Sequence, residues 1–183
     1  MNNILLGVIT LLLLLLIATN FIYLTPKPIE GEIIPSDKGR VDDIKAIESL
    51  ISKLRENWDN GDYKSYGNLF DKQAEYITFL GDRLIGNEQI AIAHQKLFED
   101  ILKGSKMQQL SIKRIRFLSE NCAIIHLTGA INPKPQKEIS DSRKSIQTLT
   151  ATKQNGEWKF SSFQNTRIQR LSLFDVLIGA IKG

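Results

Sequence analysis

Cysteine is nearly absent from this chain of 183 residues, in which Cys122 is the only one. A single cysteine excludes an intramolecular disulfide framework and a cysteine-rich zinc site. The sequence also has no nucleophile elbow, no phosphate-binding loop and no dinucleotide-binding glycine fingerprint. These absences argue against a nicotinamide-dependent oxidoreductase, and we expect no cofactor.

Charged side chains are missing from the first 26 residues, although the whole chain carries 24 Lys and Arg and 20 Asp and Glu, a net charge of +4. Residues 4–24 are uncharged, and as a helix they would span about 31 Å, which matches the hydrocarbon core of a bilayer. A cleavable secretory signal would have a shorter apolar core, a basic start and a small-x-small cleavage site. We therefore predict a retained single-pass transmembrane anchor over residues 1–25, with a cleaved signal as the alternative.

The membrane side of the following domain stays open. The nearby basic residues Lys27, Lys38 and Arg40 all follow the apolar run, which by the positive-inside tendency favours a cytoplasmic domain. Acidic residues lie among them, however, and bacterial single-pass anchors of this layout often export their domain. Residues 26–42 are rich in proline and glycine, which predicts a flexible tether between anchor and domain.

One domain fits the length of residues 43–170. Apolar residues first recur at helical spacing over residues 44–58, and Asp42 or Asp43 is available to cap the start of that helix. Gly61 suits the left-handed position that ends a helix. The chain is therefore expected to turn a tight corner at this glycine.

A short second helix is predicted over residues 63–70, with Asp62 as its cap. Residues 74–80 then alternate with aromatic side chains, as in a strand. Gly81–Asp82 offers a two-residue turn into residues 83–85, so we predict a small hairpin.

A second long helix is predicted from Asn87, its cap, to Gly104. Four strands follow, at residues 107–118, 122–131, 145–153 and 158–167. The first changes its alternation phase midway, which predicts a β-bulge near Lys113–Arg114. Asn155–Gly156 is a strong signal for a type I′ hairpin turn.

This order of elements predicts an α+β fold: a cone-shaped, curved antiparallel sheet packed on about three helices, preceded by the transmembrane helix. Residues 171–183 carry one more apolar stripe at helical spacing. Its expected partner is the domain itself, with a second copy of the chain or a membrane surface as the alternatives.

The charge is divided along the same order. Residues 27–104 carry 11 basic and 15 acidic side chains, whereas residues 105–183 carry 13 and 5. Lys113, Arg114 and Arg116 are a weak version of the basic cluster that a nucleic acid would require. Charged residues on a solvated sheet face explain them better, and we expect no nucleic-acid partner.

Four segments occur together in the order and spacing of a known protein group. They are Trp58–Asp62, Gly86–Ile90 with His94 and Phe98, Ala123 with His126, and Gly156–Trp158 with Phe163–Arg167. Over about residues 43–170 they resemble the SnoaL-like proteins, and more narrowly the SgcJ/EcaC group within the nuclear transport factor two-like superfamily.

The resemblance implies a cone-shaped α+β barrel, commonly dimeric, with a pocket at the mouth of the cone. The superfamily mixes isomerases, cyclases and dehydratases with ligand-binding and scaffold domains, so the fold does not imply a reaction. Related sequences often carry a histidine where this chain has Gln164, which removes one candidate titrating group.

His94 lies on the apolar stripe of its predicted helix, so it points inward and is either a general base or a hydrogen-bonded core histidine. His126 lies on a strand whose alternation leaves open which face is the hollow. If both face the hollow, they could form an acid–base pair; a metal site is not expected from two histidines without a third ligand. Asn165 either orients a ligand carbonyl or caps its strand.

Several aromatic side chains could line an apolar pocket, although each could equally be a core residue. The predicted ligand-binding residues are Trp58, Tyr66, Tyr76, Phe79, His94, Phe98, His126, Phe163 and Asn165.

The leading hypothesis is a membrane-tethered domain that binds a small, largely apolar molecule and catalyses no assigned reaction. The second is a cofactor-independent isomerase, cyclase or dehydratase, in which His94 moves a proton and Asn165 or His126 stabilises negative charge. The third is a structural dimerisation module. The expected partners are a small-molecule ligand, a membrane through residues 4–24 and a second copy of the chain.

Overall fold

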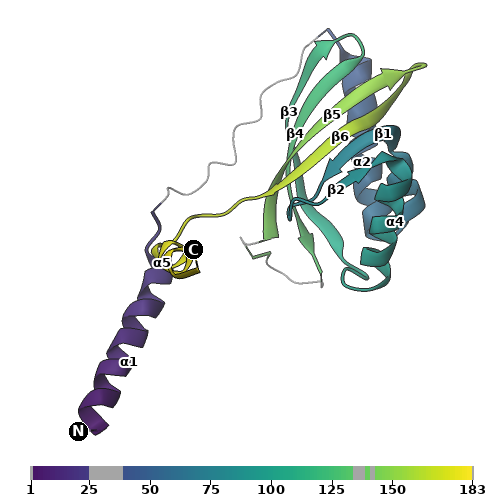
Figure 1. Ribbon diagram of the computed structural model, residues 1–183. Helices are drawn as coiled ribbons and strands as arrows, with labels where there is room; N and C mark the ends of the chain where they lie inside the picture. Colours follow the sequence, from purple (N-terminus) through teal and green to yellow (C-terminus); the bar gives the residue numbers. More distant parts are fainter. Residues whose placement is uncertain (1, 25–38, 134–138, 141–142, 183) are drawn as a thin grey trace. The chain divides into compact units, whose positions relative to one another are not determined.

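The computed structural model describes residues 2–24, 39–133, 139–140 and 143–182 (Figure 1). They divide into two compact units. One unit is the N-terminal segment together with the residues from Gln169 onward, and the other is the domain that ends at Ile168. Most of the predicted tether lies outside the described residues.

The N-terminal segment is helical, as predicted. Helix α1 covers Asn2–Ala18 and continues into the 3-10 turn η1, Thr19–Phe21. Residues Ile4–Phe21 have a mean hydropathy of 2.6, so the helix is long and apolar enough to cross a membrane. A signal sequence satisfies the same criteria, so retention of the anchor stays a prediction.

Helix α2, Val41–Asn60, begins earlier than predicted, and neither Asp42 nor Asp43 caps it. Asp43 instead joins the first turn of α2 to the sheet. Its carboxylate accepts hydrogen bonds from Lys153 at 2.9 Å, from Arg40 at 2.6 Å and from the indole of Trp158 at 2.9 Å. These bonds, that of Lys153 first, hold the pKa of Asp43 well below its usual range.

Replacing Asp43 with Ala is expected to lower the free energy of unfolding by about 2 kcal/mol, because hydrogen bonds to a charged group contribute about 1.5–3 kcal/mol and Trp158 would lose its acceptor. Urea denaturation followed by tryptophan fluorescence measures the change. Asp42→Ala, at the exposed neighbouring position, is the matched control and should change stability by less than about 0.5 kcal/mol. Equal losses in the two variants would refute the role of Asp43.

The corner after α2 forms as predicted. Gly61 ends the helix in the left-handed region, with φ 67°. The Asp62 side chain then caps helix α3, Tyr63–Asn68, by accepting a hydrogen bond from the Ser65 amide at 3.0 Å. Helix α3 is shorter than predicted because Phe70 already belongs to the first strand.

Strand β1, Phe70–Ile77, pairs antiparallel with β2, Arg83–Ile85, which confirms the predicted hairpin. The predicted two-residue turn is wrong. The hydroxyl of Thr78 accepts hydrogen bonds from the amides of Leu80 and Asp82, both at 3.2 Å, and these bonds close a wider loop.

Helix α4 covers Gly86–Glu99, and Ile85 rather than Asn87 occupies the cap position. The Gln89 side chain reaches back and accepts a hydrogen bond from the Ile85 amide at 2.9 Å, as the second half of a capping box does. The helix also ends before Gly104, which closes the turns that follow it.

Four long strands complete one six-stranded sheet of order β2-β1-β6-β5-β4-β3. They are β3 Lys106–Ser119, β4 Cys122–Asn132, β5 Lys144–Gln154 and β6 Glu157–Arg167. The antiparallel pairing of these four strands is confirmed. So is the bulge, as a register shift between Ile112 and Arg114. Positive φ angles at Asn155 and Gly156 fit the predicted type I′ turn. The parallel pairing of β1 with β6 was not predicted.

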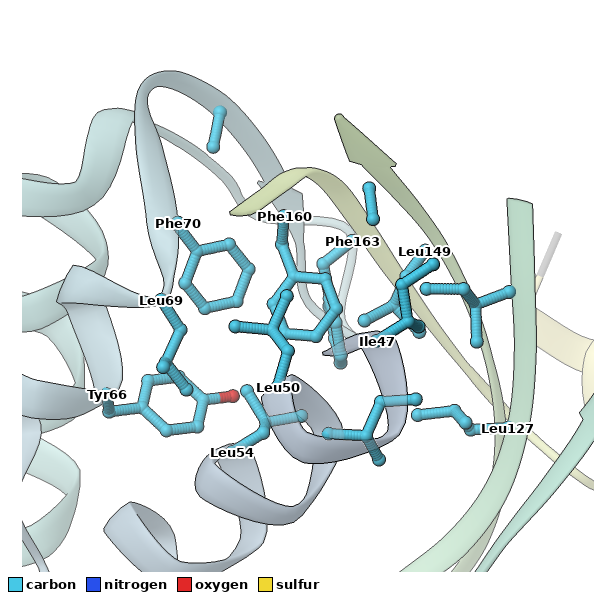
Figure 2. Close-up of a cluster of buried hydrophobic side chains, with 14 of the residues drawn as sticks. Ile47, Leu50, Leu54, Tyr66, Leu69, Phe70, Leu127, Leu149, Phe160 and Phe163 are labelled. Atoms are coloured by element: carbon cyan, nitrogen blue, oxygen red, sulfur yellow. The ribbon is translucent and has the colours of Figure 1, made fainter. Parts of the chain in front are cut away.

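Helices α2 and α4 cover one face of the curved sheet, as the α+β prediction required (Figure 1). Figure 2 shows Ile47, Leu50 and Leu54 of α2 against Leu149 and Phe160 of the sheet. We call this side of the sheet the helix-covered face. Each large apolar side chain buried there contributes about 1.5–3 kcal/mol, so the helical stripe of α2 and the alternation of the strands together form the core.

Helix α5, Leu173–Lys182, forms where the last apolar stripe predicted it. It belongs to the same compact unit as α1 and η1 and contacts η1. Packing of α5 on the domain, the first expectation, stays a prediction.

Candidate functional site

His94 is the centre of a buried aromatic cluster. Its side chain is 2% exposed and lies on α4. Four rings surround the imidazole, with centroids 4.3 Å away for Tyr66, 5.3 Å for Tyr76, 5.7 Å for Phe98 and 5.8 Å for Trp58. We call these five residues the His94 cluster. All five are among the ligand-binding residues that the sequence predicts.

The cluster forms because separate elements converge on it. Trp58 comes from the last turn of α2, Tyr66 from α3 and Tyr76 from β1, while Phe98 follows His94 by one turn of α4. Tyr76 in turn stacks on Phe163 of β6, with centroids 4.3 Å apart. The parallel pairing of β1 with β6 places these two residues side by side, so Phe163 connects the cluster to the helix-covered face.

The imidazole of His94 is neutral and has a defined tautomer. Its Nδ1 lies 2.8 Å from the carbonyl oxygen of Ile90. A carbonyl only accepts, so Nδ1 donates the proton and Nε2 keeps the lone pair. Burial lowers the pKa of His94 to about 4, against the opposing effect of the bond to Ile90.

The two tyrosines are neutral as well. Their hydroxyl oxygens lie 3.5 Å apart. Burial raises the pKa of Tyr76 to about 12 and the pKa of Tyr66 well above its ordinary value. The His94 cluster is therefore uncharged near neutral pH, and its five side chains are buried against one another, at 1–8% exposed.

Proton transfer by His94 is disfavoured by these same features. A catalytic imidazole is normally oriented by a carboxylate, whereas here the orienting group is the backbone carbonyl of Ile90. A base with a pKa of about 4 also has little driving force for taking a proton near pH 7. Among the described residues there is no group of three or more His, Cys, Asp or Glu that could hold a metal ion.

His126 lies on the opposite face of the sheet from the core. Its neighbours Ile125 and Leu127 on β4 are buried on the helix-covered face, so alternation turns His126 the other way, where it is half-buried. The structure therefore does not bring His94 and His126 together as an acid–base pair. The sequence left this open because alternation alone does not say which phase faces the helices.

Asn165 does lie on the helix-covered face, two residues beyond Phe163, and it belongs to a polar row with Gln147 and Ser145. The Gln147 amide nitrogen donates to Ser145 Oγ at 2.6 Å and to Asn165 Oδ1 at 3.3 Å. Gln147 is buried, and its Oε1 has no hydrogen-bond partner among the described residues. Buried polar atoms are normally paired, so this acceptor requires an explanation.

Gln147 was not recognised from the sequence, although a signal existed. It alternates with Leu149 and Ala151 on β5, in the phase that is buried. A polar side chain in an otherwise apolar phase of a strand is the pattern that could have identified it.

Phe79 lies outside the cluster. It is 48% exposed in the loop between β1 and β2, where the guanidinium of Arg167 stands 4.7 Å from its ring centroid. The reason is the wider loop closed by Thr78, which carries Phe79 away from the strand alternation that the sequence suggested.

A groove of about 740 Å³ is present elsewhere in the domain. It contains none of the predicted site residues; its lining is Phe70, Asp71, Lys72, Gln73, Asn87, Thr152, Gln154, Asn155, Glu157, Lys159 and Ser161. This mostly polar and charged lining does not suit the apolar ligand that the sequence predicted.

No protein-family model matches the chain, and no curated protein matches it. Solved structures do match. A domain of unknown function with a cystatin-like fold from Nostoc punctiforme is 26% identical, with a TM-score of 0.67, over 76% of this chain and 85% of that one. An NTF-2 like protein of unknown function from Shewanella oneidensis is 21% identical, with a TM-score of 0.57, over 68% and 98%. The domain has the cystatin-like fold of NTF2-like proteins.

An enzyme is also among the solved structures similar to this chain. The hexachlorocyclohexane dehydrochlorinase LinA-type3 from Novosphingobium barchaimii is 15% identical, with a TM-score of 0.59, over 73% of this chain and 92% of that one. Likeness at this identity shows the fold alone. The fold expected from the resemblance to SnoaL-like proteins is thus confirmed, and the narrower SgcJ/EcaC grouping stays a prediction.

Proposed function

We propose that this protein is a membrane-anchored, SnoaL-like domain that binds a small, largely apolar ligand on the helix-covered face, with no assigned reaction. The observation that carries the proposal is the unpaired Oε1 of Gln147, buried in the polar row beside Phe163 and the uncharged His94 cluster. The ligand would lie where the aromatic side chains give way to Ser145, Gln147 and Asn165.

The unpaired acceptor favours a binding domain over a purely structural one. Leaving a buried hydrogen-bonding group without a partner costs about 1–3 kcal/mol. A leucine at position 147 would continue the apolar phase of β5 without that cost, but it would also remove the donor that Gln147 supplies to Ser145 and Asn165. A ligand that donates a hydrogen bond to Oε1 would offset the cost when it binds.

The same geometry favours one class of ligand. Gln147 Oε1 accepts hydrogen bonds, and the nearby Phe163, two residues before Asn165 on β6, stacks on Tyr76. The fitting ligand has an apolar ring or chain and one hydroxyl or N–H donor. A carboxylate among the rings of the His94 cluster would be costly, because all five side chains of the cluster are uncharged near neutral pH.

A titration with two probes tests this proposal. Naphthol has a hydroxyl donor, and its methyl ether has the same ring without a donor. The domain, once circular dichroism confirms that it is folded, is titrated with each probe while tryptophan fluorescence is recorded, because Trp58 lies in the His94 cluster. We expect naphthol to bind about tenfold more tightly than its ether.

The Gln147→Leu variant should remove this preference and leave the ether's affinity unchanged. Gln154→Leu, an exposed position on the same strand, is the matched control and should retain the preference. Equal affinities of the parent domain for both probes, or a preference that survives Gln147→Leu, would overturn the proposal.

The alternative is a cofactor-independent isomerase, cyclase or dehydratase that uses His94 for proton transfer. The dehydrochlorinase among the similar structures supports this class by fold only, and the low pKa of His94 argues against it. A substrate screen in which a turnover is found and is abolished by His94→Ala would establish the enzyme instead.

A further inference from the structure

Helix α5 is a capped, mostly apolar helix. Its residues Leu173–Lys182 include only two charged side chains, Asp175 and Lys182. Asp175 is used within the cap, where it accepts from the Ser172 amide at 2.9 Å and from the Ser172 hydroxyl at 2.6 Å. The Asp175 amide donates in return to the Ser172 hydroxyl at 3.2 Å. This reciprocal cap defines where the helix begins.

Backbone hydrogen bonds join the start of α5 to the residues that follow the apolar span. Tyr23 and Ser172 form an antiparallel bridge. On either side of it, the Leu24 amide donates to the Leu171 carbonyl at 2.8 Å, and the Leu173 amide donates to the Ile22 carbonyl at 2.7 Å. The candidate membrane span ends at Phe21, so α5 begins next to the end of the span.

The apolar side chains of α5 fall into two groups, one half-buried and one exposed. Leu173, Phe174 and Ile178 are half-buried, and α5 contacts η1. Val176, Leu177 and Ile181 are 41%, 40% and 80% exposed. Asp175 and Gly179 lie on the side of the helix away from these residues, so α5 is amphipathic. The contact with η1 covers only part of its wide apolar face, and an amphipathic helix with such a face suits a membrane surface.

A basic and an aromatic side chain lie together where the end of the apolar span meets the start of α5. The guanidinium of Arg170 lies 3.8 Å from the ring centroid of Tyr23. Tyrosine is enriched where the headgroups of a bilayer meet its hydrocarbon core, and long basic side chains extend to this level. Their position between the end of the span and the start of α5 is the one expected for the membrane–water interface.

We propose that α5 lies in the interfacial region of the bilayer that α1 crosses, with Val176, Leu177 and Ile181 in contact with lipid. Lipid covers this apolar surface because backbone hydrogen bonds hold the start of α5 beside the end of the spanning segment. The inference rests on the membrane anchoring in the proposed function. It adds a second membrane contact, after the domain as well as before it, so that the domain is attached at both of its ends.

Site-specific fluorescence of the full-length chain in phosphatidylcholine–phosphatidylglycerol vesicles tests this inference. Cys122 is the only cysteine, so Cys122→Ser provides a background without thiols. Single cysteines then carry the environment-sensitive dye NBD at Leu177→Cys on α5, at Leu13→Cys within the span, and at Thr148→Cys on the exposed side of β5. Vesicles contain lipids with a quencher near the headgroup or, separately, at the end of the acyl chain.

We expect the label at position 177 to be quenched roughly twofold by the shallow quencher and less by the deep one, as for an interfacial helix. The label at position 13 should respond to the deep quencher, and the label at 148 to neither. Water-like, unquenched emission at 177 while position 13 stays quenched would overturn the inference and leave the anchor intact. Unquenched emission at both positions would overturn the anchor as well.

The same samples also show whether a second copy of the chain, instead of lipid, covers the apolar face of α5. In that case the label at 177 would have blue-shifted emission without quenching by either lipid, and the shift would disappear on dilution into excess vesicles. That result would also overturn the lipid contact.

Discussion

Acidification from pH 7 to pH 4 is expected to lower the free energy of unfolding of the domain by about 3 kcal/mol through His94 alone. The cause is the burial of a neutral imidazole among four aromatic rings, which lowers the pKa of His94 from 6.5 to about 4. Because a small domain is stable by only about 5–15 kcal/mol, this one side chain would remove a large part of the total.

The sign of this change in stability depends on whether the folded or the unfolded state binds the proton more readily. Between pH 6.5 and about 4, the histidine of the unfolded chain is protonated while His94 of the folded domain is not. The unfolded state therefore binds more protons in this window, and stability falls as the pH falls. The full stability is present above about pH 6.5, and the loss is complete below about pH 4.

Urea denaturation at a series of pH values, followed by tryptophan fluorescence, measures this effect. Both tryptophans, Trp58 and Trp158, lie in the domain, so the membrane segment does not contribute. His94→Phe keeps a ring in the cluster without a titrating group, and its stability should change little between pH 7 and pH 5. His126→Gln keeps His94 and should retain the dependence of the parent. A parent domain equally stable at pH 7 and pH 5 would contradict the burial of a neutral His94.

Replacing Gly67 with Ala is expected to destabilise the domain by about 2–3 kcal/mol, because overpacking of a close contact costs about 1–3 kcal/mol. Gly67 lies in α3 where it crosses α4. A methyl group there would lie 2.7 Å from the Ala91 side chain and 2.8 Å from the Asn87 carbonyl oxygen. A backbone carbonyl cannot rotate away, so the two helices would have to separate.

The sign of this prediction opposes the intrinsic helix preference. In an isolated helix, Gly→Ala stabilises by about 1 kcal/mol. Asn68→Ala, at the exposed neighbouring position in α3, is therefore the matched control and should be neutral or slightly stabilising. The midpoints of thermal unfolding, recorded by circular dichroism, compare the two variants. A more stable Gly67→Ala domain would show that α3 and α4 do not approach this closely.

Much of the local structure was predictable because it depends on short-range chemistry. Gly61 ends α2 in the left-handed conformation, Asn155–Gly156 turns the last hairpin, and the bulge near Lys113 follows from the change of alternation phase. Helix starts were less predictable. The carboxylate of Asp43 could have capped α2 locally, but it bonds with Lys153 and Trp158, which are distant in the sequence.

The candidate site was predictable in part for the same reason. Helical spacing places His94 and Phe98 on one buried face of α4, and this was visible in the sequence. The spacing does not show that β1 pairs in parallel with β6, which brings Tyr76 onto Phe163. Nor does strand alternation reveal which phase of a strand faces the helices. In the folded domain, that phase excludes His126 from the cluster and places Gln147 on the helix-covered face.

The sequence by itself determined that an uncharged apolar helix precedes an α+β domain, and that one cysteine leaves no disulfide framework. These properties depend on composition and on residue periodicity, which are local. The tertiary structure alone decided the neutral state of His94, the unpaired acceptor of Gln147 and the contact of α5 with the end of the apolar span. Each of these depends on how residues distant in the chain are packed, because burial and hydrogen-bond pairing are properties of the surroundings rather than of the residue.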